Sequence, residues 1–481
     1  MYYLKMDVLT LEGAMEKYRN LIMEITDLDV HNYLTISSIG QSYVISKGCY
    51  DNCVKVSSSL RQYIQLAIKG GRVYIPDSNK GQVFGSDSNP VADFDGVSLY
   101  LSAMKEVPGI PMGLIKKGLV DTNYDEKTHY IIRSKIKKIN KTQSVPMISY
   151  NNTDGTIKYT NNINEVFDKI LTIDKTTHED FIKFHQIEYD IIDGIYWDEG
   201  YNTKIKEIAQ HLHLERCKYK KTNVPLAKCL KLIGNSIYGK SGIRKSDTKT
   251  VFVSKIAFNK YVSDHWGLIS EIQETPFNYK IIKSNFDMSF NRNYIACSIL
   301  SQSKRIMQQV FNCFDNEKKQ VFYTDTDSIH CLKKDIEIIA ENYKKEYNRE
   351  IIGNDLGQFH NDFEMNNCKN VDSVYHQPIG TKCYIDVLRG IDVNTNKFKY
   401  DLHLRLKGVS SLGMDERIKC EMKTLKCDRI DAAKSIYKKL SNKEGIRFTM
   451  KPSFNNPSFI FDKDGVKTRE TGQFIRCVRF N

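Results

Sequence analysis

The acidic triplet Asp325-Thr326-Asp327 is well suited to hold a metal ion. It lies between two short β-type runs, Val321–Thr324 and Ser328–Leu332, so the pattern predicts a hairpin with carboxylates at its tip. Carboxylates on a rigid strand pair suit hard divalent cations, which take oxygen ligands. Asp and Thr are also ordinary turn residues, so a solvated turn is the alternative interpretation of the triplet taken alone.

Asp95 is a second acidic residue in a position that suits metal binding. It ends the run Val91–Asp95, which predicts a short buried strand, and the next residues turn into a predicted helix, Leu99–Glu106, with Ser98 as its N-cap. The C-terminal end of a strand is where α/β architectures place ligands and metals. Asp95 is therefore a candidate metal ligand, and Tyr100 lies within reach of whatever Asp95 holds.

Two predicted helices further along carry cations. In the first, Arg216 and Lys220 stand four residues apart near the C-terminal end. In the second, Pro225 suits the first turn, and the predicted buried face consists of Leu226, Cys229, Leu230, Ile233 and Ile237. The opposite face carries Lys228, Lys231, Asn235 and Tyr238. Such a face can present cations to a triphosphate and stack an aromatic ring on a base.

A solvated lysine face is the alternative for this second helix. It accounts for Lys228 and Lys231 but not for the run Asn235–Gly239, in which Gly239 is predicted to end the helix. The run Ile68–Arg72 leaves a similar choice open. Its paired glycines predict either a plain hairpin turn or a close approach of the backbone to a phosphate, with Lys69 and Arg72 beside it.

Asp95 and Asp327, with a cationic helix face, are the parts of a two-metal phosphoryl-transfer site. In such a site two divalent ions about 3.5–4 Å apart activate the attacking hydroxyl and stabilise the leaving pyrophosphate. Lysine and arginine bind the triphosphate and offset the charge of the transition state.

Composition agrees with a polyanionic partner. The 481 residues carry a formal net charge of +13, spread along the chain, which favours nucleic acid. The twelve cysteines include no C-x-x-C pair, so a reducing, intracellular compartment is expected. The sequence shows neither a signal peptide nor an apolar run of about 18 residues, so we expect no membrane partner.

Three motifs in this order resemble those of family B DNA polymerases. Motif A is matched by Asp95–Tyr100, motif B by Lys231–Gly239 and motif C by Tyr323–Ser328. The resemblance is close to the branch found in viruses, linear plasmids and self-replicating transposons, many of whose members are protein-primed. Further likenesses are Lys382-Cys-Tyr384 to the K-x-Y motif that holds the primer end, Ile68–Gly71 to Y-x-G-G, and Arg216–Lys220 to the R-x-x-x-K of the fingers.

The resemblance implies a role for each matching residue. Asp95 and Asp327 would bind two Mg²⁺ ions, for which Mn²⁺ can substitute, assisted by the Gly96 carbonyl, while Asp325 would tune the site. Lys231, Arg216 and Lys220 would hold the triphosphate, with Lys228 a further candidate. The nucleotide would also contact Asn235, Tyr238, Tyr100 and Ser98. Primer and template DNA would meet Lys382, Tyr384, Gly70, Gly71 and Arg72.

The implied fold is α+β, a right-hand polymerase with an antiparallel-sheet palm, fingers, thumb and mainly β insertions. The expected segments are an exonuclease-remnant helix (1–24), a connector with N-terminal palm (25–90), palm with motif A (91–109), an insertion that contacts a terminal protein (110–195), fingers (196–242), a second insertion or palm extension (243–292), palm with motif C (293–390) and thumb (391–481). The two insertions have an alternative interpretation as enlarged fingers and palm loops.

The first helix carries one further likeness. Tyr3 and Asp7 stand four residues apart, which alone predicts a surface pair, but they resemble the Y-x-x-x-D third motif of the proofreading exonuclease. The two earlier exonuclease motifs are not in this sequence, so we expect the polymerase half of a longer enzyme, without exonuclease activity in this chain.

The sequence departs from the family pattern at two positions. Leu101 stands where a proline usually follows S-L-Y, and Ile68 replaces the tyrosine of Y-x-G-G, which bears on how template passes between active sites.

Two other functions stay open. An inactive polymerase relic that binds DNA would tolerate loss of the carboxylates, and a reverse transcriptase would be expected to show Asp-Asp where this chain has Asp-Thr-Asp.

Overall fold

The computed structural model describes residues 2–152, 155–243, 248–284, 291–314, 320–450, 458–462, 465–470 and 474–480. The chain divides into two compact units. Unit 1 comprises Met1–Gly70 and Ser98–Ile306, and unit 2 comprises Gly71–Val97 and Met307–Asn481. Parts of the expected segments 243–292 and 391–481 lie outside the described residues.

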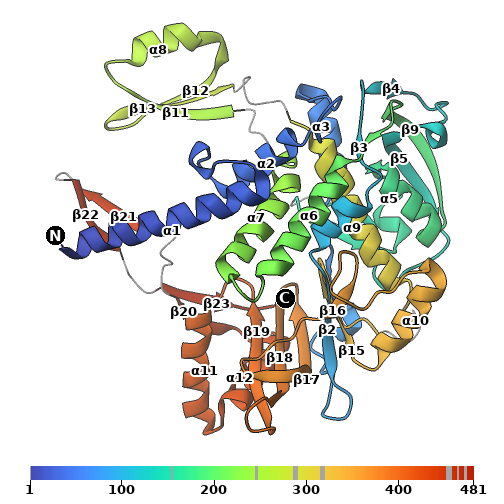
Figure 1. Cartoon of the computed structure of the whole chain (residues 1–481), viewed down its shortest axis with the longest axis vertical. Coiled ribbons are helices and arrows are strands. Elements are labelled where there is room, and N and C mark those ends of the chain that lie inside the picture. Colours follow the sequence, from blue (N-terminus) through green and yellow to red (C-terminus); the bar gives the residue numbers. More distant parts are fainter. Residues whose placement is uncertain are drawn as a thin grey trace. The chain divides into compact units, whose positions relative to one another are not determined.

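Unit 2 is built on an eight-stranded sheet whose paired strands are antiparallel (Figure 1). The strands run in the order β1-β14-β15-β2-β17-β18-β19, and β16 also pairs with β2. Their bounds are β1 Val73–Tyr74, β2 Val91–Gly96, β14 Tyr323–Asp325, β15 Ser328–Leu332, β16 Phe359–Asn361, β17 Cys368–Gly380, β18 Cys383–Asp392 and β19 Phe398–Leu406. The predicted hairpin around Asp325 and Asp327 is confirmed as the β14–β15 pair.

The other elements of unit 2 complete its core. They are α10 Asp335–Tyr347, α11 Ser411–Leu425, α12 Arg429–Ser441, β20 Ile446–Met450, β21 Ser458–Asp462, β22 Gly465–Glu470 and β23 Phe474–Val478. The buried face of α12, which includes Ile436, Tyr437 and Leu440, packs with Ile385 of β18 and Phe448 of β20. Helix α11 buries only a few of its side chains, among them Met414 and Ile418.

The helices of unit 1 come from the two chain segments that lie before and after β2. Its helices are α1 Tyr2–Thr26, α2 Ile36–Ser46, α3 Ser58–Ala67, α4 Leu99–Glu106, α5 Lys175–Asp180, α6 Lys204–Tyr219, α7 Val224–Ser241, α8 Phe258–His265 and α9 Asn293–Phe311, the last continuing past Ile306 into unit 2. Among the described residues, no helix combines the length and apolar character needed to cross a membrane.

The stretch between α4 and α6 is mainly β, as predicted. A four-stranded sheet has the order β4-β9-β5-β8. The strands of this stretch are β3 Ile110–Pro111, β4 Lys116–Gly118, β5 His129–Ile139, β6 Ile148–Asn151, β7 Ile157–Thr160, β8 Ile170–Asp174, β9 Ile187–Trp197 and β10 Tyr201–Asn202. Side chains of β5, of β8 and of the π-helical turn Phe181–His185 that follows α5, among them Ile132, Ile173 and Phe181, share one buried core.

A separate three-stranded sheet lies between α7 and α9. Its strands β11 Thr248–Ser254, β12 Ile269–Glu274 and β13 Asn278–Ser284 have the order β11-β13-β12, and α8 accompanies them. Most side chains of β11 and β12 are exposed, whereas those of β13 are mostly half-buried.

Candidate active site

The acidic turn of unit 2 is held tightly by backbone contacts. Asp325 and Ser328 are register partners, and the Asp327 amide donates to the Asp325 carbonyl across 2.7 Å. Thr326 therefore takes a φ of +65°, in the left-handed region. The Thr326 amide donates to the Arg72 carbonyl at 2.7 Å, which fixes the turn from a second side.

Asp95 and Asp327 lie at the same end of neighbouring strands. Asp95 pairs with Ser328 across β2 and β15, and the Gly96 amide donates to the Asp327 carbonyl at 2.8 Å. Both side chains are partly exposed, so their carboxylates are accessible to a ligand. Oxygen donors on paired strands are the set that Mg²⁺ prefers, and these residues fit it.

Asp325 has a different environment from its two acidic neighbours. Lys382 Nζ lies 2.7 and 2.8 Å from its two carboxylate oxygens, and the Tyr323 hydroxyl lies 3.4 Å from Oδ2. Each oxygen keeps a second lone pair, but the ammonium charge beside Asp325 offsets the negative charge that would attract a metal ion. This arrangement agrees with the expectation that Asp325 tunes the site, which stays a prediction.

Tyr323 is a site residue that the sequence analysis missed. Its hydroxyl accepts a hydrogen bond from the Lys382 amide at 3.0 Å and so positions the turn that carries Lys382. Strand periodicity could have revealed this residue. Tyr323 and Asp325 are two residues apart on one strand, so their side chains point to the same face.

Tyr384 is almost fully buried at 7% exposure. Its ring contacts those of Tyr323, His330 and His403, with centroids 5.0, 5.1 and 5.7 Å away. The predicted contact of Tyr384 with the primer stays a prediction, and only a small part of the side chain could make it.

Of the two glycines, Gly71 approaches a neighbour closely, and that neighbour is the acidic turn, whereas a Cβ at Gly70 would meet nothing within 4 Å. A Cβ at Gly71 would lie 2.5 Å from Thr326 Cγ2, so only glycine fits there. The alternative of a plain hairpin turn is wrong, because the pair connects α3 to β1. In unit 1, the Gly70 carbonyl accepts from the Tyr159 hydroxyl at 2.8 Å.

The expectation that Arg72 meets DNA is corrected by the structure. The Arg72 side chain is 3% exposed, donates to Gln308 Oε1 at 2.6 Å and lies 4.9 Å over the Phe311 ring. A guanidinium group engaged in this way is a packing element of unit 2.

Ser98 and Arg216 are brought together in unit 1. Arg216 Nη1 donates to Ser98 Oγ at 2.5 Å. Ser98 occupies the N-cap position of α4, but its backbone is left-handed, with φ +46°, and its side chain makes no capping hydrogen bond. The predicted capping role is therefore wrong, since the hydroxyl accepts from Arg216.

Tyr100 and Tyr238 form a stacked pair in unit 1. Their ring centroids lie 4.1 Å apart with an interplanar angle of 29°. Leu101, the residue that departs from the family pattern, packs against Gly234 of α7, where an added Cβ would lie 3.0 Å from Leu101 Cδ2. The small residue lets α4 and α7 approach, which brings the two tyrosines into contact.

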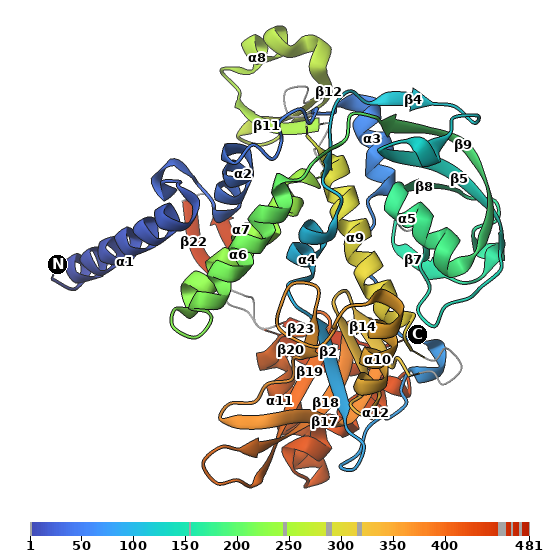
Figure 2. The same ribbon diagram turned by 45° about the vertical axis from the view of Figure 1, so that its right-hand side comes forward.

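Helices α6 and α7 of unit 1 carry the predicted lysines on exposed positions. Helices α6 and α7 lie side by side (Figure 2). Lys220 ends α6, and the exposed α7 residues Lys228 and Lys231 precede the half-buried Asn235. Two details differ, because α7 continues past Gly239 to Ser241 and Cys229 is only half-buried.

Tyr3 and Asp7 lie on α1, as predicted, and both side chains are exposed. Tyr3 retains 79% of its accessible surface. The pair is therefore at the surface of unit 1, and its exonuclease role stays a prediction.

The sequence of this chain is similar to those of known DNA polymerases. A family model described as DNA polymerase type B, organellar and viral, matches residues 1–266. A protein of Kluyveromyces lactis named DNA polymerase is 24% identical over 378 residues, covering 74% of this chain and 35% of the relative. The chain thus spans about a third of the length of that relative.

Two solved structures of Phi29 DNA polymerase share the fold. One, the ternary complex with primer-template DNA and incoming nucleotide substrates, has a TM-score of 0.60 at 15% identity and covers 94% of this chain and 69% of that chain. The other, the post-translocation binary complex with primer-template DNA, has a TM-score of 0.61 at 14% identity and covers 96% and 70%. The α+β right-hand fold is thereby confirmed, and, because the family model matches more than half of its residues, this chain belongs to the organellar and viral type B DNA polymerases.

Proposed function

We propose that this chain catalyses template-directed addition of deoxynucleotides to the 3′-hydroxyl of a DNA primer. The observation that carries the proposal is the position of Asp95 and Asp327 at one end of the paired strands β2 and β15, in a member of a DNA polymerase family. The ion pair of Asp325 with Lys382 supports the choice of Asp95 and Asp327 as the metal-binding pair.

In the proposed reaction the primer O3′ forms a bond to the α-phosphorus of the incoming nucleotide, and the bond from that phosphorus to the bridging oxygen breaks to release pyrophosphate. Asp95, Asp327 and the Gly96 carbonyl would hold two Mg²⁺ ions, or Mn²⁺ in their place. Bound there, the ions would lower the pKa of the attacking hydroxyl and stabilise the charge on the leaving group. The strand pairing fixes the two carboxylates before substrate arrives, so little reorganisation is needed.

The nucleotide would be held by unit 1. Arg216, Lys220 and Lys231 would bind the triphosphate, with Lys228 at the edge of the cationic face. Asn235 and Tyr238 would line the nascent base pair, while Tyr100 and Ser98 would lie at the sugar and phosphate. Only five residues separate Asp95 from Tyr100, so the chain itself keeps their Cα atoms within about 18 Å.

DNA would be held mainly through its phosphates. The net charge of +13 is spread along the chain, and phosphate contacts supply most non-specific affinity. Lys382 and Tyr384 would lie at the primer end, and the backbone at Gly70 and Gly71 would lie near the template.

The finer organisation follows the resemblance. We assign 25–90 to a connector with the N-terminal part of the palm, 91–109 and 293–390 to the palm, 196–242 to the fingers and 391–481 to the thumb. The segment 110–195 would be an insertion that contacts a terminal protein primer, and 243–292 would be a second insertion or a palm extension. Helix 1–24 would correspond to a helix of the exonuclease domain, and the free thiols favour a reducing compartment.

Primer extension on separate DNA and RNA templates tests the proposal. We expect Mg²⁺-dependent extension on DNA, lost by about three orders of magnitude or more in Asp327→Asn, with primer-template binding nearly unchanged. The matched control is Asp401→Asn, which alters an exposed carboxylate on β19 of the same unit.

Other outcomes would point to the other functions. Extension only on RNA would identify a reverse transcriptase, and DNA binding without extension would identify an inactive relic. A covalent adduct between a candidate terminal protein and labelled dATP, dependent on Asp327, would establish protein priming.

A further inference from the structure

A row of histidine and aspartate side chains crosses the sheet of unit 2, away from the acidic turn. Its members come from five strands: His330 of β15, Asp93 of β2, His376 of β17, Asp386 of β18 and His403 of β19. His330 is the register partner of Asp93, and Asp386 is the partner of both His376 and His403. Register partners point to the same face of a sheet, so the antiparallel pairing itself builds this row.

The centre of the row is completely buried. His330, His376 and Asp386 each have 0% exposure, and their ligand atoms all lie within 4.8 Å of one another. His330 Nδ1 lies 3.3 Å from His376 Nδ1, which lies 2.9 Å from Asp386 Oδ1. No function described above uses these three side chains.

These distances match the ligand shell of a tetrahedral metal ion. Zn²⁺ binds imidazole nitrogen and carboxylate oxygen at about 2.0–2.2 Å, so two ligand atoms on a tetrahedron lie about 3.3 Å apart. The 3.3 Å separation of the two imidazole nitrogens equals that value, the 2.9 Å separation of His376 Nδ1 and Asp386 Oδ1 is shorter than it, and the remaining pair of ligand atoms lies within 4.8 Å. We propose that His330 Nδ1, His376 Nδ1 and Asp386 Oδ1 bind one Zn²⁺ ion that is separate from the catalytic metals.

Two further members of the row have the geometry of supporting groups. Asp386 Oδ2 lies 3.3 Å from His403 Nδ1, and His330 Nε2 lies 3.6 Å from Asp93 Oδ1. Metal-binding histidines usually direct their second nitrogen to a carboxylate, and metal-binding carboxylates are themselves hydrogen-bonded. Asp93 and His403 would orient His330 and Asp386 in this way.

A hydrogen-bonded network without metal is the competing interpretation, and the charge of the site counts against it. Within the described part of the chain, neither Asp93 nor Asp386 has a lysine or arginine ion-pair partner, so two carboxyl groups share this site with imidazoles alone. A divalent cation would balance the buried charge.

The proposed Zn²⁺ ion would affect the strands that carry the catalytic carboxylates. Asp93 is two residues before Asp95 on β2, and His330 is three residues after Asp327. A metal ion that joins β15, β17 and β18 would therefore brace the sheet directly beneath the catalytic end. This role is structural and does not depend on the proposed polymerase activity.

Metal analysis of the full chain, purified without a histidine tag, tests the proposal. We expect about one equivalent of Zn²⁺ per chain, lost in His376→Gln and Asp386→Asn and retained in His31→Gln, which changes an exposed histidine. The double variant Asp95→Asn/Asp327→Asn should keep its Zn²⁺, because the catalytic carboxylates are not among the ligands.

A measurement on the wild-type chain keeps the test decisive if the ligand variants fail to fold. Chelated protein reloaded with Co²⁺ alone should show the visible absorption of a tetrahedral site without a thiolate charge-transfer band, and Zn²⁺ should raise its Tm. Folded wild-type chain that binds no Zn²⁺ or Co²⁺, or folded His376→Gln that retains a full equivalent, would overturn the proposal.

Discussion

Lys382 Nζ lies 2.7 and 2.8 Å from the two carboxylate oxygens of Asp325, although 57 residues separate them in the sequence. The pair joins the β14–β15 hairpin to the turn between β17 and β18. Lys382 is 52% and Asp325 20% exposed at the side chain, so the ion pair itself adds little to stability. The ion pair matters instead for the chemistry of the site, because it gives Asp325 a different charge environment from that of Asp327 in the same turn.

A double-mutant cycle on this pair tests whether the two residues act as one unit. We expect Asp325→Asn and Lys382→Met each to lower kcat/KM for primer extension, and the double variant to be no worse than the poorer single variant. The reason is that either change alone removes the contact. Effects that multiply in the double variant would show that Lys382 and Asp325 act separately, for example with Lys382 bound to the primer.

The stacked pair of Tyr100 and Tyr238 leads to a prediction about sugar choice. In the proposed site the Tyr100 ring would lie beneath the deoxyribose and clash with a 2′-hydroxyl. Tyr100→Val should raise ribonucleotide incorporation relative to deoxyribonucleotide by about tenfold or more, as expected for loss of a steric contact worth 1–3 kcal/mol. Competition between labelled ATP and dATP measures the ratio.

Tyr238→Leu should raise the same ratio to a smaller extent, because it removes only the ring that supports Tyr100. Tyr219→Leu on α6 is the matched control and should leave the ratio unchanged. An unaltered ratio in Tyr100→Val would remove Tyr100 from the sugar site.

Local patterns in the sequence predicted much of this site. The β14–β15 hairpin, β2, α4 and α7 depend on neighbours within a few residues, where apolar spacing and turn residues act directly. The α+β class followed from these elements together with the family resemblance.

What the sequence could not supply is strand order and long-range pairing. The contact of Lys382 with Asp325 and the burial of Arg72 against Gln308 both depend on which strands and helices become neighbours. A period of two places His376 and Asp386 each on a strand face, yet it does not say that β17 and β18 pair in the register that aligns them. Ser98 shows the same limit. Local spacing predicted that its side chain caps a helix, but its hydroxyl accepts a hydrogen bond from Arg216 of α6 instead.

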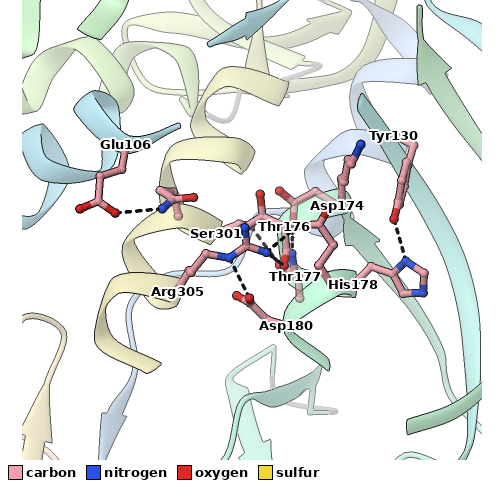
Figure 3. Close-up of polar contacts among 12 residues, drawn as sticks. Glu106, Tyr130, Asp174, Thr176, Thr177, His178, Asp180, Ser301 and Arg305 are labelled. Carbon is pink, nitrogen blue, oxygen red and sulfur yellow. Dashed lines mark hydrogen bonds and ion pairs between the residues drawn. The ribbon is translucent and has the colours of Figure 1, made fainter. Parts of the chain in front are cut away.

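Arg305 of α9 is predicted to stabilise unit 1 by pairing with a buried carboxylate. It donates to Asp180 Oδ1 at 2.7 Å and to Glu179 Oε2 and the Thr176 carbonyl at 2.8 Å each (Figure 3). Burial raises the pKa of Asp180 to about 7 despite the opposing pull of Arg305. Arg305→Met should therefore destabilise unit 1 by about 3 kcal/mol, as removing one partner of a buried pair does.

The loss should grow as the pH rises through about 7, the pKa that Asp180 has beside Arg305. Below that pH the folded wild-type chain and the folded variant both hold the Asp180 proton and lose stability in parallel as the pH rises, whereas above it only the wild type stabilises the charged carboxylate through Arg305. Asp180→Asn in the same chain should restore part of the loss, because it removes the unpaired charge. Urea titrations at pH 6 and pH 8 measure both effects, and equal destabilisation with and without Asp180→Asn would contradict this account.

His129 predicts an acid sensitivity of unit 1. Its ring is 4% exposed and lies 5.4 Å from Trp197, and burial lowers its pKa to about 4 from the usual 6.5. Because the folded-state pKa is depressed, the contribution of His129 to stability is full above pH 6.5 and is lost as the pH falls towards 4. The loss is at most about 3 kcal/mol.

His129→Phe should flatten this part of the pH profile, since phenylalanine fills the same space without taking up a proton. Unfolding midpoints between pH 7 and pH 4 provide the measurement. A His129→Phe profile as steep as that of the wild type would assign the sensitivity to other groups, such as His178, whose pKa is also lowered by burial.

The sheet β11-β13-β12 is predicted to support synthesis through duplex DNA. Its strands pair only with one another in the part of the chain that the structure describes, and Thr248 is the register partner of Ser284. The two ends of the module therefore lie about 5 Å apart, and a short Gly-Ser linker can replace residues 248–284.

The module also exposes three large aromatic side chains and carries several lysines. Phe252, Trp266 and Phe277 are 64%, 73% and 83% exposed. Exposed aromatic rings with nearby cations are suited to stack on unpaired bases and contact phosphates.

Deletion of 248–284 should leave the filling of short gaps intact, because Asp95, Asp327 and the cationic face of α7 lie outside the deletion. Synthesis through a downstream duplex should fall by about tenfold or more, since each lost stacking contact is worth about 1–3 kcal/mol. The matched variant Trp266→Ala/Phe277→Ala keeps the strands and should reproduce most of the defect if the exposed rings carry the function. Undiminished strand displacement by the deletion variant, with normal gap filling, would show that the module is an enlarged loop rather than a DNA-contacting insertion.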